Sequence, residues 1–454
     1  MTRKARGRRD TLESAIETVL DPGRFVSYNA NFDFVRGLEQ VEEQLQRLIP
    51  TEPARAIALY EAFLAGCYEK AEEIDDSSGS LGQFVDDLFR GWIRARQAAG
   101  AEPNQTIDRL LEWMDDDPYG FASDLDKEAA RVLERAGLRA FAEQARARFD
   151  AAATTKPTPG EPFRGNPDYQ RRRWGAALRT LYLAQKDIEA YVGLAEETGL
   201  TAEDCHALAT MLDARRKPEE ALDWVERGID LDKEAPHGST VSHDLARLRR
   251  DLLTKLGRGN EALDAAWAEY GKYPSKYSYD DLMKYVPKAQ RTAWHERAME
   301  AAQGADLHSL IDLLLEAKEP ERLAELVRRS QDTSLEDVSH YVTERAAKKL
   351  EKTHPDVAAR LWRAQGMRIV NAKKSKYYDA ALSNFECAKR CYEKAGLTAE
   401  WEKTVNQLRA EHHRKTGFMS GFEDLVAGSG PSDRPSFLER AKTRWGGRQR
   451  RGDQ

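Results

Sequence analysis

The chain has 454 residues, of which 41% are hydrophobic and 33% are charged, and its mean hydropathy is −0.72. This composition is too apolar for a disordered chain, and its high charge is typical of amphipathic helices with large solvent-exposed faces. The formal charge of −6 is uneven, because residues 1–10 carry +4 and residues 440–454 carry +5, which leaves −15 for the body. We interpret the basic ends as disordered, solubilising tails.

No stretch approaches about 18 consecutive apolar residues, and the basic start runs into an amphipathic segment instead of an apolar signal core. Four cysteines are few for this length, and no Cys-x-x-Cys or Cys-x-Cys pair occurs. These features predict a cytoplasmic protein without a transmembrane segment.

The first part of the chain predicts successive amphipathic helices separated by short breakers. The expected helices are Phe32–Leu48, Pro53–Ile74, Leu81–Ala99, Ile107–Met114, Asp124–Arg135 and Leu138–Phe149. The break at Asp75–Gly79 combines acidic residues with serines, which would also suit a cation. We favour ordinary turn chemistry there, with Ser78 or Ser80 as the N-cap of the next helix.

A stretch rich in proline and glycine follows and excludes a helix. It contains Pro157, Pro159, Pro162, Pro167, Gly160 and Gly165. Since proline lacks the amide donor that a helix needs, we expect a linker over residues 151–168.

Beyond Tyr169 the pattern becomes repetitive. Lys217–Trp224 has a counterpart at Arg258–Ala265, offset by 41 residues, and weaker echoes begin at Pro355 and Lys376. A small alanine followed by a leucine lets two helices approach closely, and the period fits tetratricopeptide-like or HEAT-like repeats. We therefore predict an all-α fold, an α-α superhelix or tetratricopeptide-like helical-repeat solenoid with an N-terminal helical module.

The expected organisation has five parts. A basic tail covers residues 1–10, the N-terminal helical module residues 11–150, the linker residues 151–168, the α-solenoid residues 169–425, and a flexible basic tail residues 426–454. Within that last tail Ser436–Trp445 is a candidate short helix that docks onto a partner or an acidic membrane, or folds back onto the solenoid.

Motifs for catalysis are absent from the sequence. There is no phosphate-binding glycine loop, dinucleotide fingerprint, nucleophile elbow or kinase motif set, so we expect neither an enzyme nor a cofactor. Cys387 and Cys391 lie one helical turn apart, and with His412 they are candidate zinc ligands. We favour ordinary packing for these side chains, because cysteine is among the most buried residue types.

Three basic clusters have aromatic or basic neighbours that would suit phosphate contact and base stacking. They are Arg171, Arg172 and Arg173 before Trp174; Lys373, Lys374 and Lys376 before Tyr377; and Arg414 with Lys415. The alternative, which we favour in a net-negative body, is that their methylene stems cover aromatic core edges.

Two segments resemble an uncharacterised bacterial family of all-helical proteins, and the resemblance runs from about Phe25 to Phe422. The residues that carry it are Gly23–Val26, Asp75–Gly79, Leu81, Gly82 and Phe84, then Ser375–Tyr377, Ala380, Ala381, Cys387, Trp401, Leu408–Ala410, His412, Arg414, Lys415, Gly417 and Phe418. The family resembles the helical region that follows SWIM zinc-binding modules, but the SWIM motif is absent here. The resemblance implies stacked helical hairpins and no particular activity.

The function expected from these features is that of a non-catalytic scaffold or adaptor that binds a protein partner on its helical-repeat surface. The alternative is a nucleic-acid-associated protein that contacts phosphate through its basic clusters and tails. The sequence leaves the oligomeric state open.

Overall fold

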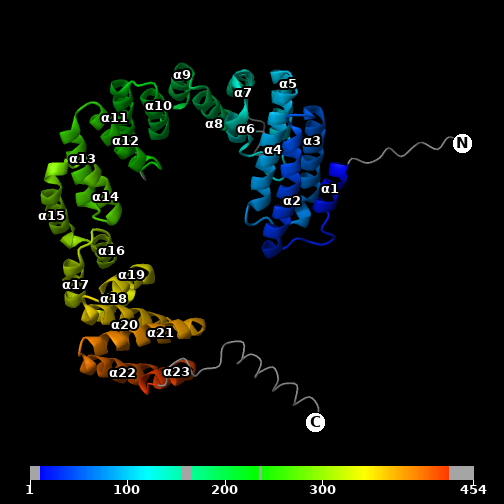
Figure 1. Ribbon diagram of the computed structural model, residues 1–454. Coiled ribbons are helices and arrows are strands. Elements are labelled where there is room, and N and C mark those ends of the chain that lie inside the picture. The colour runs from blue at the N-terminus through cyan, green and yellow to red at the C-terminus, as the bar shows by residue number, and fades with distance from the viewer. Residues whose placement is uncertain (1–10, 155–165, 235–237, 429–454) are drawn as a thin grey trace, which may run out of the picture. The chain divides into compact units, whose positions relative to one another are not determined.

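The computed structural model describes residues 11–154, 166–234 and 238–428, and short turns join helix to helix throughout them (Figure 1). These residues contain no β-strand, and their one isolated β-bridge joins Val26 to Ile74. The prediction of an all-α fold is confirmed. No helix in this part of the chain has both the length and the apolar character needed to cross a bilayer.

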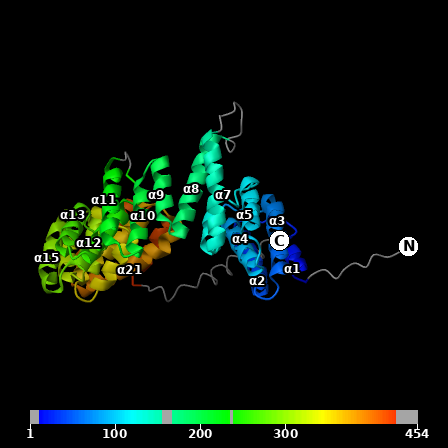
Figure 2. The same cartoon turned by 90° about the horizontal axis from the view of Figure 1, so that it is seen from above.

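Contacts divide the chain into two units, the first of which extends to Leu252. In Figure 2 the helices α1 to α5 of unit 1 lie side by side, and α7 lies against α8. The helices are α1 (Thr11–Leu20), α2 (Tyr28–Leu48), α3 (Pro53–Lys70), η1 (Ala71–Glu73), α4 (Ser80–Ala98), α5 (Pro103–Asp115), α6 (Leu125–Val132), α7 (Arg135–Thr154), α8 (Pro167–Gln185), α9 (Ile188–Thr198), α10 (Ala202–Ala214) and α11 (Pro218–Glu234).

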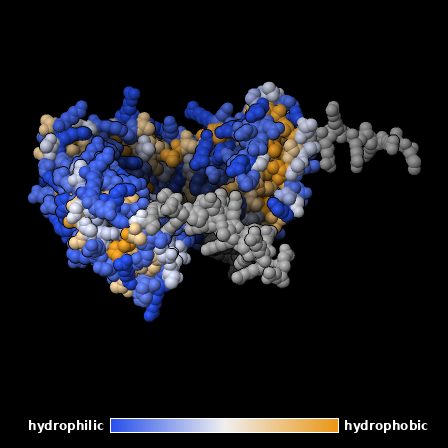
Figure 3. All heavy atoms as spheres, turned by 60° about the horizontal axis from the view of Figure 1, so that its bottom comes forward, coloured by the Kyte–Doolittle hydropathy of each residue, from blue (hydrophilic) through white to orange (hydrophobic). Residues whose placement is uncertain are grey.

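Unit 2 begins at Leu253, inside α12 (Ser242–Lys255), and continues as stacked helices. They are α13 (Gly259–Lys272), α14 (Lys276–Tyr285), η3 (Lys288–Gln290), α15 (Arg291–Ala301), η4 (Ala302–Gly304), α16 (Leu307–Glu316), α17 (Pro320–Arg329), α18 (Asp332–Asp337), α19 (His340–Leu350), α20 (Pro355–Asn371), η5 (Ser375–Tyr377), α21 (Tyr378–Lys394), α22 (Thr398–His412) and α23 (Thr416–Val426). The surface visible in Figure 3 is mainly hydrophilic, with hydrophobic side chains gathered in small patches.

One turn recurs between paired helices. Its central residue has a positive φ, and the amide of the next residue donates to a carbonyl five residues earlier at 2.8–3.0 Å, as in a Schellman motif. The central residues are Gly100, Lys186, Arg216, Gly257, Lys318 and Gly396. Since the next helix begins two or three residues later, the chain reverses its direction between the two helices.

The predicted repeat agrees with these turns. α11 and α13 start at Pro218 and Gly259, and the preceding turns hydrogen-bond to Leu212 and Leu253. Within the two helices Ala221 and Ala262 are fully buried, as close approach of a neighbouring helix requires. The expected roles of the repeated alanines are therefore confirmed.

The Asp75–Gly79 break is a turn, as predicted, and Ser78, one of the two predicted serines, accepts the amide of Ser80 at the helix start at 3.3 Å. The N-cap position itself is not a serine. Gly79 occupies the N-cap of α4 with a φ of 73°, and no side chain at that position caps the helix. Asp76 does so instead, because its carboxylate accepts the amides of Leu81 at 2.9 Å and Gly82 at 3.0 Å. A carboxylate also suits the positive end of the helix dipole better than a hydroxyl does.

The helices on either side of the predicted linker share one core. Phe149 of α7 and Trp174 of α8 belong to the same buried cluster, and residues 155–165 lie outside the described part of the chain. The division at residues 151–168 stays a prediction, whereas the contacts place a boundary at Leu252. The basic tails and the candidate helix Ser436–Trp445 also lie outside the described residues.

The two glycines around the α12–α13 turn provide a matched test of the recurrent turn. Gly257 has a φ of 76°, whereas Gly259 starts α13, and a Cβ added at either position would meet nothing within 4 Å. We expect Gly257→Ala to lower the free energy of unfolding by about 1–2 kcal/mol, because only glycine adopts the left-handed region without strain. Gly259→Ala should leave it unchanged or raise it slightly in the same urea titration; equal losses would contradict the argument.

The closing hairpin packs through Trp401, which is 6% exposed and lies 6.0 Å from the ring of Phe422. Trp401→Ala should therefore lower the free energy of unfolding by about 3–5 kcal/mol, from lost burial and the cavity left behind. Chemical denaturation measures the loss, and Tyr273→Ala, a change at a 77% exposed side chain, serves as the control.

Candidate functional site

One hollow in unit 2 lies over α20, between α19 and α21. Both of these helices pack on α20, and they leave a space of about 960 Å³ between them, which we call the trough. Each segment lines it with one stripe of side chains spaced by three, four and three residues, as one helical face requires. The stripes are Tyr341, Glu344, Lys348 and Glu351; Trp362, Gln365, Ile369 and Ala372; and Tyr377, Ala380, Asn384 and Cys387.

The floor of the trough is formed by α20 and combines apolar with polar groups. Trp362 is 5% exposed, and its indole nitrogen donates to Oε1 of Glu351 at 2.9 Å. Gln365, one turn further along, is 6% exposed, and among the described residues its Nε2 has no hydrogen-bond acceptor. A buried donor without an acceptor is rare in folded proteins.

A second hollow of about 530 Å³ adjoins the trough and shares Tyr341, Glu344 and Lys348 with it. Its other walls come from α14 and α16 and include Tyr277 and Asp312. Side chains of α14, α16, α19, α20 and α21 line the two hollows. We use "the groove" for this combined surface.

Three tyrosines stand out along the groove because they are exposed. Tyr277 is 74%, Tyr341 72% and Tyr377 46% exposed, and each lies at or immediately before the start of a helix that faces the groove. A basic or imidazole side chain precedes each one. Lys276 Nζ lies 4.9 Å from the Tyr277 ring centre, Lys376 Nζ lies 4.8 Å from that of Tyr377, and the His340 ring lies 3.9 Å from that of Tyr341.

The groove is positively charged within a negatively charged chain. Its lining includes the six basic side chains Lys276, Arg345, Lys348, Arg368, Lys374 and Arg390, but only the three carboxylates Asp312, Glu344 and Glu351. Several of these pair with one another: Asp312 accepts from Lys276 at 2.9 Å and from Arg345 at 3.3 Å. Lys374 makes no ion pair within the described residues, so its charge is available at the rim of the trough.

The first predicted basic cluster lies in unit 1 and is largely engaged there. Arg171 pairs with Glu197 at 2.9 Å and lies 4.3 Å from the ring centre of Phe149. Arg173 donates to the carbonyl of Met114 and lies against Trp174. Arg172 is exposed. Two of the three arginines thus cover aromatic rings, which is the packing role weighed against phosphate binding.

The structure brings the two other basic clusters together at the end of α20. Lys373, Lys374 and Lys376 are exposed in the connection to α21, and Arg414 is exposed between α22 and α23. Lys415 Nζ donates to the carbonyl of Val370 at 2.5 Å and so caps the last turn of α20. Burial, together with the charge of Lys373, lowers the pKa of Lys415.

The three candidate zinc ligands have different surroundings. Cys387 lines the trough, whereas Cys391 and His412 are buried. Burial raises the pKa of both thiols, that of Cys391 to about 11, which disfavours the thiolate that zinc requires. In the described part of the chain no three His, Cys, Asp or Glu side chains form a group that could hold a metal ion.

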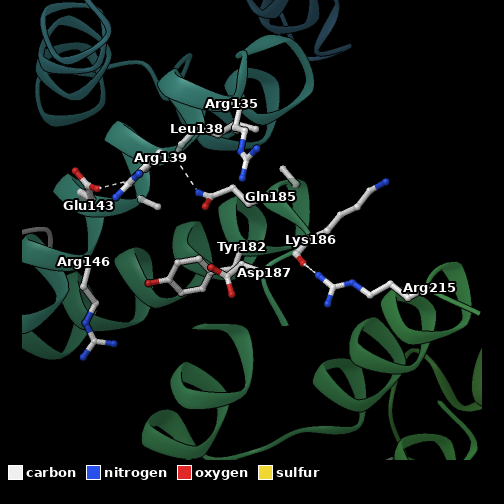
Figure 4. A pocket seen from close by; sticks show the side chains of 12 residues that line it. Arg135, Leu138, Arg139, Glu143, Arg146, Tyr182, Gln185, Lys186, Asp187 and Arg215 are labelled. Atoms are coloured by element: carbon white, nitrogen blue, oxygen red, sulfur yellow. Dashed lines mark hydrogen bonds and ion pairs between the residues drawn. The ribbon is translucent and has the colours of Figure 1, made fainter. Parts of the chain in front are cut away.

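A further hollow of about 880 Å³ lies in unit 1 between α7, the α8–α9 turn and the end of α10. Its lining includes the basic side chains of Arg135, Arg139, Arg146, Lys186 and Arg215 (Figure 4), but several of them are already engaged. Arg139 pairs with Glu143 at 3.0 Å, Arg146 with Glu197 at 2.8 Å, and Arg215 donates to the carbonyl of Lys186. These bonds fix the turn between helices, and no polar group here is left as isolated as Gln365 is in the trough.

Comparison with known families gives one match. The model of a family described as "Family of unknown function (DUF6880)" matches residues 17–420. The chain belongs to this family. The match agrees with the predicted resemblance to an uncharacterised family and shows no link to SWIM modules.

No curated protein matches this DUF6880 chain. Among solved structures, a chain of "Structure of Naa15/Naa10 bound to HypK-THB" is similar, with 13% identity, a TM-score of 0.35 and coverage of 88% of this chain. This chain spans 63% of that one. A "Circular tandem repeat protein with novel repeat topology and enhanced subunit contact surfaces" matches with 10% identity, a TM-score of 0.19 and coverages of 92% and 97%. Likeness at this level says nothing about binding or activity.

Lys374 and Cys387 were singled out in the sequence, but most of the groove of this DUF6880 protein was not. Tyr277, Tyr341 and Gln365 were not singled out. A signal for the tyrosines was present, since each directly follows a lysine or a histidine in the sequence. For Gln365 there was none, because a polar residue on a helix ordinarily faces solvent.

The pH dependence of the stability tests whether His412 of α22 is buried. Burial and the charge of Lys415 lower its pKa below the ordinary value near 6.5, against a weaker opposing effect of Glu411. Below that pH the unfolded chain binds the proton more readily than the folded one, so stability should fall as the pH drops through about 6.5. Replacing His412 with Gln should reduce the difference in Tm between pH 7.5 and pH 5.5. His413→Gln, at the exposed neighbour, should leave that difference as in the wild type.

Proposed function

We propose that this chain is a non-catalytic scaffold or adaptor whose unit 2 holds a carboxylate-rich segment of a protein partner in the groove. The observation that supports the proposal most is that the two hollows adjoin at Tyr341, Glu344 and Lys348 and have three exposed tyrosines in their lining. Tyrosine is enriched at the centres of protein interfaces, where it supplies a large contact area at low entropic cost.

Charge favours an acidic occupant. The groove has twice as many basic side chains as carboxylates, and Lys374 is available at its rim. Complementary charge speeds encounter and selects among partners, so a segment with several Asp or Glu residues fits this surface best.

The predicted association with nucleic acid has less support. Arg171 and Arg173 are engaged within unit 1, so this hypothesis depends on the exposed side chains of Arg172, Lys373, Lys374, Lys376 and Arg414 and on the basic tails. The experiment below separates the two classes of partner.

The test compares exposed tyrosines inside and outside the groove. Tyr341→Ala and Tyr277→Ala remove groove contacts, whereas Tyr273→Ala removes a tyrosine of similar exposure that lines neither hollow. We expect proteins retained by the tagged wild type after nuclease treatment to be retained by Tyr273→Ala. The two groove variants should lose them, with affinity reduced at least tenfold, as for an interface hot spot.

Unchanged Tm values would show that all three variants fold. Equal retention by all of them would contradict the proposal, and loss of every retained protein on nuclease treatment would favour nucleic acid as the partner.

A further inference from the structure

The side chains of the trough can be ordered along α20, because α19 runs antiparallel to it. Arg368, near the end of α20, donates to the carbonyl of Val338, just before the start of α19, at 2.6 Å. Trp362, earlier in α20, donates to Glu351, just past the end of α19. The side chains at the start of α19 therefore lie near the end of α20, where α21 also starts.

This end of the trough offers apolar surface that an occupant can reach. Five apolar or aromatic side chains that are exposed or half-buried line it: Tyr341, Ile369, Ala372, Tyr377 and Ala380. At the other end Arg390 pairs with Glu351 at 3.7 Å. An apolar side chain of an occupant would therefore be best removed from water beside the two tyrosines.

Exposed basic side chains lie directly beyond this apolar end. Lys374 lines the trough, and Lys373 and Lys376 flank it in the connection from α20 to α21. Lys415, which caps the last turn of α20, fixes the neighbouring Arg414 at the same end of that helix.

We call Lys373, Lys374, Lys376 and Arg414 the basic corner. All four side chains are exposed, and none of them forms an ion pair within the described residues. The carbonyls at the end of α20 already bind Lys415, so like charges gather here without a carboxylate between them. Such a cluster attracts anions and is relieved of its own repulsion when they bind.

The basic corner extends outside the trough, since Lys374 lines the trough and the other three do not. A bound segment that follows the trough to its apolar end would continue onto the corner. Its side chains there must be acidic to match the surface, whereas the side chain just before them must be apolar.

We propose that the partner's segment places an apolar side chain at the Tyr341 end of the trough and adjacent carboxylates on the basic corner outside it. This inference rests on the proposed function of the groove. It adds a second contact surface, formed by the α20–α21 and α22–α23 connections, and the order of side chains in the bound segment.

The experiment selects ligands from a randomised peptide library displayed on phage, using the full-length protein. Selected peptides should combine an aromatic or aliphatic residue with neighbouring Asp or Glu residues and should be poor in Lys and Arg. The tightest peptide is then labelled, and its affinity is measured by fluorescence anisotropy. A copy with Asn and Gln in place of Asp and Glu, and an oligothymidylate of the same length, serve as comparison probes.

Two charge reversals test the basic corner. Lys374→Glu and Arg414→Glu, both at exposed positions, should weaken the peptide at least tenfold without a change in Tm, because each brings like charges together. Lys352→Glu makes the same change of charge in the α19–α20 connection, at the opposite end of α20, and lines neither hollow. This control should keep the affinity within about twofold of the wild type, since distant surface charges are screened by salt.

A further variant tests the apolar end of the trough. Ala380→Gln enlarges an exposed side chain of α21 that lines this end, without adding charge. It should weaken the peptide about tenfold at an unchanged Tm, because the added atoms occupy the space of the apolar side chain.

The outcomes separate the inference from the function it rests on. Wild-type affinity in Arg414→Glu or in Ala380→Gln, with binding still lost in Tyr341→Ala, would overturn the inference and leave the groove as the binding surface. An equal loss in Lys352→Glu would assign the effect to net charge and would also overturn it. Selection of basic peptides, or tighter binding of the oligothymidylate with the same dependence on Arg414, would do so as well. Binding unaffected by Tyr341→Ala, or a library that yields no binder, would overturn both.

Discussion

The turn with a left-handed residue between paired helices is the constraint on which the rest of the structure depends. Because only two to four residues connect the helices of a pair, the chain reverses direction between them, and the apolar face that the pair leaves uncovered must pack against a neighbouring pair. In such an array each hairpin buries its core against the next one, which accounts for a long chain of helices without a sheet.

The trough follows from this packing in unit 2. Gly366 allows α21 to approach α20 closely, since a Cβ there would lie 2.7 Å from the ring of Phe385. With α19 packed on the same helix, the stripe of α20 that contains Gln365 and Ile369 is flanked on both sides and left uncovered above. The groove is thus a consequence of how three helices pack, and its chemistry comes from the few side chains on their facing stripes.

Much of the fold was accessible from the sequence, because apolar periodicity and the 41-residue repeat both reflect local packing. The helix starts were harder to predict from the sequence. At α4 a serine cap was expected, but Asp76 accepts the amides of Leu81 and Gly82, because the turn brings its carboxylate to the helix start. The left-handed turns at Lys186, Arg216 and Lys318 have no signature in the sequence. At the equivalent turns of Gly100, Gly257 and Gly396, the glycine itself indicates a left-handed residue. The groove was predicted least, because the burial of Gln365 depends on how the side chains of α19 and α21 pack on α20, which the periodicity of one helix does not show.

Gln365 is an exception within α20, because the neighbouring polar side chains of this helix form hydrogen bonds. Arg360 donates to the carbonyls of Arg328 and Ser330 and to Asp332, and Trp362 and Arg363 are paired as well. A helix that satisfies its other buried polar groups so fully is well packed, so the unpaired amide does not reflect a loose core. Unsatisfied buried donors cost about 1–3 kcal/mol, and sequences that fold well retain such departures mainly at functional sites. Because this nitrogen has almost no accessible surface, the missing hydrogen bond lowers the stability of α20 itself.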